Sequence, residues 1–165
     1  CIITRQKRNI QLRLLSSEKE LIQYINYRLM EKVFQLIEKA ILIAEDSILL
    51  NRMIVESLSK AGYTRLIHTA NGQEAYDKIL EFKESGTLND NVQCVITDIE
   101  MPIMDGHRLT KLIKEDDSLK SIPVVIFSSL VNDEMRRKGE SLGADAQLSK
   151  PEIGNLVHLI DDLLL

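Results

Sequence analysis

Five short apolar runs alternate with five longer amphipathic segments from residue 40 onward, and this alternation limits the possible folds more than any other feature. We interpret the runs as strands, because they have strand length and consist mainly of apolar residues. They are ILIA at 41–44, LIHTA at 66–70, CVIT at 94–97, VVIF at 124–127 and AQLS at 146–149. The amphipathic segments are predicted to be helices at 47–61, 73–85, 106–115, 132–142 and 152–164.

Repeated alternation of strand and helix predicts one parallel sheet with helices on both faces. The runs at 41–44, 94–97 and 124–127 are apolar at nearly every position. Strands that are buried on both faces have this composition. We therefore expect a doubly wound, five-stranded α/β domain with these three runs at the centre of its sheet.

The first 39 residues differ from the rest of the chain in charge and in pattern. They contain eight Lys or Arg and four Asp or Glu, whereas residues 40–165 contain thirteen and twenty-one. Residues 18–38 have helical spacing, with apolar side chains on one face at Ile22, Ile25, Leu29 and Val33. We expect residues 1–39 to be an N-terminal extension or linker with a helix at 18–38, and residues 40–165 to be the functional domain.

Charge and composition exclude several classes of protein. The acidic balance of residues 40–165 argues against nucleic-acid binding, because phosphate contacts need clustered Lys and Arg. The two cysteines, Cys1 and Cys94, give no metal-ligand spacing and are typical of a reducing compartment. No apolar stretch is long enough to span a bilayer. We expect a cytoplasmic protein without membrane insertion.

Polar residues follow four of the predicted strands. Glu45 and Asp46 follow the first, Asp98 the third, Ser128 the fourth and Lys150 the fifth. Each of them alone is weak evidence, since an acid at a strand end often caps a helix and a lysine there is often solvated. Ligands of an open parallel sheet bind beyond the carboxyl ends of its strands, so residues at successive strand ends predict one site.

The chemistry of this predicted site follows from its charges. Three carboxylates in one crevice repel one another, so we expect a cation between them at neutral pH. Oxygen ligands without His or Cys favour Mg²⁺ over zinc. Phosphoryl transfer needs a metal on one side of the transferred group and a positive charge on the other, which Lys150 supplies. We therefore predict that Asp98 is a nucleophile that accepts a phosphoryl group.

Four motifs that occur in order closely resemble the receiver domain of two-component response regulators. They are ILIAEDS at 41–47, ITDIEMPIMDG at 96–106, PVVIFSS at 123–129 and GADAQLSKP at 143–151. The combination is specific, because single short motifs of this kind would mean little. The resemblance covers residues 40–165 and implies the flavodoxin-like, CheY-like strand order 2-1-3-4-5.

The resemblance also assigns roles to residues of the site. It implies that Asp98 is the phosphoacceptor and that Glu45, Asp46 and Asp98 bind Mg²⁺ together with the backbone carbonyl of Glu100. Ser128 matches the hydroxyl that moves on activation, and Lys150 matches the lysine that pairs with the phosphoacceptor. A receiver of this kind catalyses only its own phosphorylation and dephosphorylation, so we do not expect an enzyme with a separate substrate.

Some positions differ from the family pattern. Glu45 stands where an aspartate is common, and its longer side chain implies weaker metal binding. Gln147 stands where most receivers have Tyr or Phe, so we expect the output surface to switch by another route or only slightly. His68, His107 and His158 form no cluster, and we assign none of them as a phosphodonor.

A narrower resemblance, to one type of receiver, implies a pathway and partners. The segments IAEDS at 43–47, TDIEMPIMDG at 97–106 and the stretch 127–152 are most similar to the C-terminal receiver of CheV-type chemotaxis proteins. This resemblance implies a CheA-like histidine kinase as phosphodonor and a chemoreceptor–kinase complex as a further partner. The oligomeric state does not follow from the sequence.

Two other functions remain open at this point. An aspartate-nucleophile phosphatase also uses Mg²⁺ and a strand-end aspartate, but Glu100 stands where its general-acid aspartate is needed. A pseudo-receiver that acts only as a protein-interaction module is conceivable because of Glu45 and Gln147.

Overall fold

The computed structural model describes residues 18–129 and 133–165 of the chain. The chain forms two compact units, residues 1–35 and 36–165. The basic opening of the predicted extension lies outside the described residues, as does residue 132, where the sequence predicts that a helix begins. The boundary between residues 39 and 40 remains a prediction.

The N-terminal helix that the sequence predicts is present as α2, Glu18–Glu38. Its apolar stripe is exposed, with 53% of Ile22, 57% of Leu29 and 49% of Val33 accessible to solvent. No helix in residues 18–129 or 133–165 combines the length and the hydropathy that a bilayer span requires.

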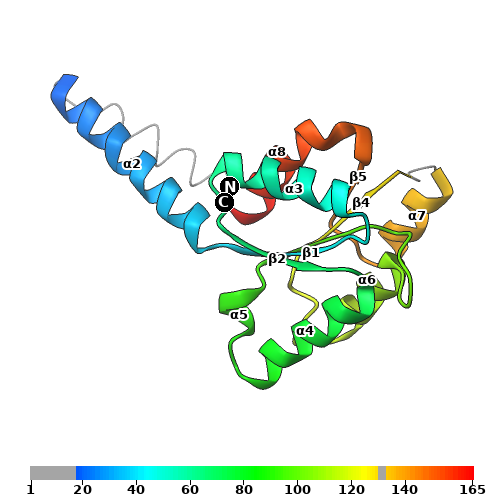
Figure 1. The fold of residues 1–165 in the computed structure, drawn as a ribbon. Helices are drawn as coiled ribbons and strands as arrows, with labels where there is room; N and C mark the ends of the chain where they lie inside the picture. The colour runs from blue at the N-terminus through cyan, green and yellow to red at the C-terminus, as the bar shows by residue number, and fades with distance from the viewer. Residues whose placement is uncertain (1–17, 130–132) are drawn as a thin grey trace. The chain divides into compact units, whose positions relative to one another are not determined.

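Five parallel strands form one sheet in the second unit (Figure 1). The strands are β1 Ala40–Ala44, β2 Arg65–Thr69, β3 Cys94–Thr97, β4 Val124–Ser128 and β5 Ala146–Ser149. Their order in the sheet is β2-β1-β3-β4-β5, which confirms the predicted order. The order reverses between β1 and β3, so the crevice beyond these two strands is where a ligand is expected.

Helices cover both faces of the sheet, as the alternation predicts (Figure 1). Two of them, α3 and α8, lie on one face, and α4, α5 and α6 lie on the other. The helices of this unit are α3 Ile48–Ala61, α4 Gly72–Glu84, α5 Leu88–Asn91, α6 Gly106–Glu115, α7 Asp133–Ser141 and α8 Ile153–Leu164, with a 3₁₀ turn at Lys150–Glu152. The sequence does not predict α5, because four residues are too few to show a helical period.

Strand β1 shows how the sheet is buried on both faces. Ile41 and Ile43 pack into the apolar cluster under α3 and α8, and Leu42 and Ala44 pack into the cluster under α4 and α6. All four are at most 1% exposed. Side chains alternate between the faces of a strand, so an apolar residue is needed at every position. This explains the continuous apolar run from which the strand is predicted.

Helix caps set where the two loops next to the site end. The Ser47 side chain accepts a hydrogen bond from the Leu50 N–H and so starts α3. Only Glu45 and Asp46 therefore lie between the end of β1 and the cap of the next helix. In the same way, the Asp105 side chain accepts from the Arg108 N–H, at 2.7 Å, and starts α6. The acids that follow β1 and β3 therefore lie at the sheet edge, each on a loop that ends at a helix cap.

Candidate functional site

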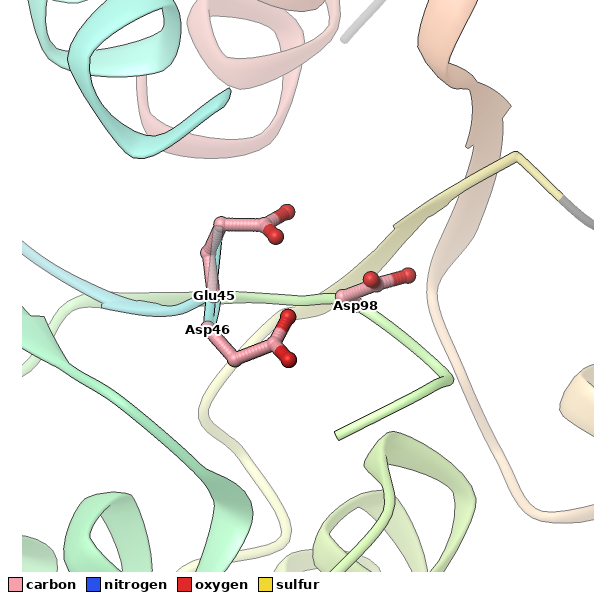
Figure 2. A group of neighbouring side chains, drawn as sticks. All are labelled: Glu45, Asp46 and Asp98. Carbon is pink, nitrogen blue, oxygen red and sulfur yellow. The ribbon is translucent and has the colours of Figure 1, made fainter. Parts of the chain in front are cut away.

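Two acidic residues follow β1, and the adjacent strands hold them in place. The Glu45 N–H donates to the Thr69 carbonyl at 3.1 Å, which extends the pairing of β1 with β2 by one residue. The Glu45 side chain is 1% exposed, and its Oε1 accepts from the Ser47 N–H at 3.0 Å. Asp46 is exposed. Figure 2 shows the two carboxylates on the same side of the chain, toward the position of Asp98.

Asp98 follows β3 and is held directly beside these acids. Its N–H donates to the Ala44 carbonyl at 2.9 Å, and its Oδ1 accepts from the Ile99 N–H at 2.7 Å. Asp98 is 6% exposed. Carboxylate oxygens of Glu45, Asp46 and Asp98 lie within 4.8 Å of one another (Figure 2). The predicted acidic crevice is therefore present, at the point where the strand order reverses.

Lys150 bridges two of the three acids from the end of β5. Its Nζ lies 2.7 Å from Asp98 Oδ2 and 3.0 Å from Glu45 Oε2, and its side chain is 10% exposed. Burial lowers the pKa of Lys150, but the hydrogen bond to Asp98 and the negative charges of Asp98 and Glu45 outweigh this effect, and the pKa is raised. Burial raises the pKa of Glu45, and the negative charge of Asp98 adds to the effect, against the opposing effect of Lys150.

The donor set fits a hard divalent cation. Glu45 Oε2 is buried and accepts no hydrogen bond from the described residues, although it pairs in charge with Lys150. This oxygen therefore keeps lone pairs for a metal or for a metal-bound water. Asp46 and Asp98 add oxygen donors within reach of the same point. An all-oxygen set of this kind suits Mg²⁺.

The other predicted site residues are Ser128, which ends β4 next to β3, and Glu100, which lies two residues after Asp98. Ser128 is fully buried at the end of β4, and its register partner is Ser149, the residue before Lys150. Glu100 is exposed in the loop after β3. Gly106 lies at the end of this loop and packs against the backbone of Asp98. A Cβ at position 106 would collide with the Asp98 carbonyl oxygen. The close approach explains why glycine is required there.

Gln147 makes contacts that an aromatic ring at this position would not make. Its Nε2 donates to the Arg136 carbonyl in α7 at 2.7 Å. A Cβ on Gly139 would lie 2.5 Å from Gln147 Oε1, so the side chain occupies the space that this glycine leaves open. Gln147 therefore ties β5 to α7, and Gly139 permits the contact.

The three histidines have different surroundings. His68 Nε2 lies 2.9 Å from the Glu45 carbonyl oxygen, a contact that the sequence does not reveal because it depends on the register of β2 against β1. His107 is buried, and its Nε2 has no hydrogen-bond partner among the described residues. Burial, followed by the nearby charge of Lys138, lowers the pKa of His107. His158 is exposed on α8.

The sheet order and the strand-end residues together define a receiver-like α/β domain with an acidic crevice. Residues 41–161 match the response regulator receiver domain. The chain therefore belongs to the receiver domain family of two-component signalling systems.

Individual relatives agree with this assignment. The chain is 35% identical over 127 residues to the chemotaxis protein CheV2 of Helicobacter pylori. This alignment covers 77% of this chain and 39% of that protein. The chain is 39% identical over 83 residues to the gliding motility regulatory protein of Myxococcus xanthus. This alignment covers 50% of this chain and 10% of that protein. The chain thus spans well under two thirds of either protein.

A solved structure supports the fold independently. The signal receiver domain of a signal transduction histidine kinase from Syntrophus aciditrophicus superimposes with a TM-score of 0.65 at 29% identity. The match covers 76% of this chain and 89% of that one.

Proposed function

We propose that this domain accepts a phosphoryl group on Asp98 from the phosphohistidine of a histidine kinase, in a Mg²⁺-dependent reaction. The observation that carries the proposal is the position of Lys150 Nζ, 2.7 Å from Asp98 Oδ2 and 3.0 Å from Glu45 Oε2, at the edge of a three-carboxylate cluster. A structural ion pair needs one acid, whereas this lysine meets a crowded acidic crevice. Crowding of this kind is typical of functional sites.

Asp98 is the nucleophile of the proposed transfer. One of its carboxylate oxygens attacks the phosphorus atom, the bond from phosphorus to the imidazole nitrogen breaks, and the electron pair stays on the imidazole. The Ile99 N–H donates to Asp98 Oδ1 and the Lys150 ammonium donates to Oδ2, each at 2.7 Å, and we propose that Oδ2, the oxygen beside Lys150, is the one that reacts. The Lys150 ammonium then passes from the free carboxylate to an oxygen of the phosphoryl group.

Glu45, Asp46 and Asp98, together with the backbone carbonyl of Glu100, are proposed to hold the Mg²⁺ ion. When bound, the cation neutralises negative charge that the carboxylates and the phosphoryl group bring together. Ser128 is proposed to donate its hydroxyl hydrogen to the phosphoryl group, because it ends β4 beside the strand that leads to Lys150.

Chemotaxis is the proposed pathway, and a CheA-like kinase is the proposed phosphodonor. The support is the similarity to the chemotaxis protein CheV2 over 77% of this chain. A chemoreceptor–kinase complex is the corresponding further partner, and phosphorylation of Asp98 is proposed to tune its output.

Acetyl phosphate provides a test of the proposal that needs no kinase. With Mg²⁺ present, we expect intact-protein mass spectrometry to show the gain of one phosphoryl group, and we expect no gain when EDTA removes the metal. Equal labelling with and without Mg²⁺, or no labelling at all, would contradict the proposal. Steady turnover of p-nitrophenyl phosphate would favour the phosphatase instead, and a lack of labelling would favour the pseudo-receiver.

A kinase must also find a docking surface beside the crevice. Four large apolar side chains are exposed on the segments that follow Glu45 and Asp98: Ile48 77%, Leu49 67%, Met53 41% and Ile103 79%. Ile103 has a φ of 68°, in the left-handed region that a β-branched residue rarely adopts. An exposed isoleucine in this conformation costs stability, so we propose that its side chain contacts the kinase domain that carries the phosphohistidine.

Replacing Ile103 by Asn separates the backbone strain at this position from the proposed contact with the kinase. Asn tolerates the left-handed region, so the free energy of unfolding is expected to rise by about 1 kcal/mol. Transfer from a phosphorylated kinase is expected to slow several-fold, while the rate with acetyl phosphate stays unchanged. Ile103→Val, which keeps both the strain and the apolar contact, is the matched control. Equal slowing with both donors would argue against a docking role.

A further inference from the structure

His68 contacts the backbone between two proposed metal ligands, although it is not a ligand itself. The residue lies on β2, one position before Thr69, and is exposed. Its Nε2 lies 2.9 Å from the carbonyl oxygen of Glu45. Because a carbonyl oxygen only accepts hydrogen bonds, Nε2 carries the proton and donates it.

The hydrogen bond replaces a missing backbone partner. Strand β1 ends at Ala44, which pairs with Thr69, the last residue of β2. The Glu45 N–H still donates to the Thr69 carbonyl at 3.1 Å, but α4 follows closely, with its cap at Asn71. The Glu45 carbonyl is therefore bound by a side chain of β2 where the sheet no longer offers a backbone N–H.

This carbonyl belongs to the peptide group that joins Glu45 to Asp46. Fixing its oxygen fixes the plane of that peptide and with it the direction in which the Asp46 side chain leaves the backbone. Asp46 is exposed, so surrounding side chains constrain it less than they constrain Glu45, which is 1% exposed. The backbone is thus the main means by which the protein can orient Asp46 toward the crevice.

We infer that His68 is a positioning residue, which preorganises the Glu45–Asp46 peptide so that both carboxylates point at one cation. The inference rests on the proposed function, because it requires a metal in the acidic crevice. Partners that orient metal ligands without touching the metal typically change affinity by about 10- to 100-fold when they are removed.

Mg²⁺ affinity, measured by isothermal titration calorimetry, tests the inference without any phosphorylation. In His68→Ala we expect the affinity to fall by about tenfold, with the melting temperature of the metal-free protein almost unchanged. In His68→Gln the amide Nε2–H reaches a similar distance from the backbone, so we expect most of the affinity to return. His158→Ala, which removes an exposed histidine from α8, is expected to bind Mg²⁺ like the wild type.

The outcomes separate the positioning role of His68 from the proposed metal site. Unchanged Mg²⁺ affinity in His68→Ala overturns the positioning role and leaves the proposed function intact. A loss in His68→Ala that Gln does not restore also overturns it, because the hydrogen bond is then not responsible. Absence of Mg²⁺ binding in the wild type overturns the proposed metal site itself.

Discussion

Replacing Lys150 by Met is expected to lower the free energy of unfolding of the metal-free protein by about 3 kcal/mol. The lysine lies between Asp98 and Glu45, which are 6% and 1% exposed, and its removal leaves two buried acids without a compensating charge. Methionine keeps most of the apolar stem, so the loss reports the charge and not the packing. Urea unfolding in the presence of EDTA measures the free energy of unfolding of the metal-free variant and wild type.

Mg²⁺ is expected to reverse much of this loss. The added cation takes over the role of the missing ammonium, and binding at 100 times the dissociation constant stabilises a folded protein by about 2.7 kcal/mol. Lys150→Met is therefore expected to bind Mg²⁺ more tightly than the wild type, in which the ammonium repels the ion. Lys60→Met serves as control, since Lys60 and Glu56 form a pair whose side chains are 74% and 60% exposed. Lys60→Met is expected to change the free energy of unfolding by less than about 1 kcal/mol.

A metal-free Lys150→Met protein as stable as the wild type would contradict this account. It would mean that the acids of the crevice do not depend on the lysine, and that the geometry of the ion pair has no energetic consequence.

Replacing Asp98 by Asn is expected to abolish phosphorylation. An amide is not a nucleophile under these conditions, whereas its oxygen can still accept the hydrogen bond from the Ile99 N–H that holds Asp98 Oδ1 at 2.7 Å. The fold is therefore expected to persist, and the labelling by acetyl phosphate to fall to background. Mass spectrometry measures the labelling, and circular dichroism measures the fold.

Asp105→Asn is the matched control for this change. Asp105 is an exposed carboxylate on the same loop, where it caps α6 by accepting from the Arg108 N–H. Asn caps helices as well as Asp does, so this variant is expected to be labelled like the wild type. Labelling that persists in Asp98→Asn would mean that another residue is the acceptor.

The sequence predicted the architecture well, because strands buried on both faces leave a strong pattern. Cys94–Thr97 and Ala146–Ser149 have the predicted bounds, and β1, β2 and β4 are within one residue of theirs. The crevice formed by Glu45, Asp46 and Asp98 was also predictable, since carboxyl ends of parallel strands meet at one edge. The roles of these residues remain proposals.

Features that depend on register or on side-chain packing were not predictable. The contact of His68 with the Glu45 carbonyl requires the alignment of β2 with β1, which apolar runs do not specify. The fit of Gln147 against Gly139 requires the position of α7 relative to β5. A single sequence specifies neither the contact of His68 with Glu45 nor that of Gln147 with Gly139, so both are seen only in the folded chain.

Chemical mapping of the phosphoryl group tests the central claim most directly. After reaction with acetyl phosphate and Mg²⁺, borohydride reduces an aspartyl phosphate to homoserine, which peptide sequencing by mass spectrometry locates. We expect homoserine at position 98 and at no other acidic residue of the crevice. Homoserine at position 46, or a phosphoryl group that resists reduction because it sits on Ser128, would contradict the account.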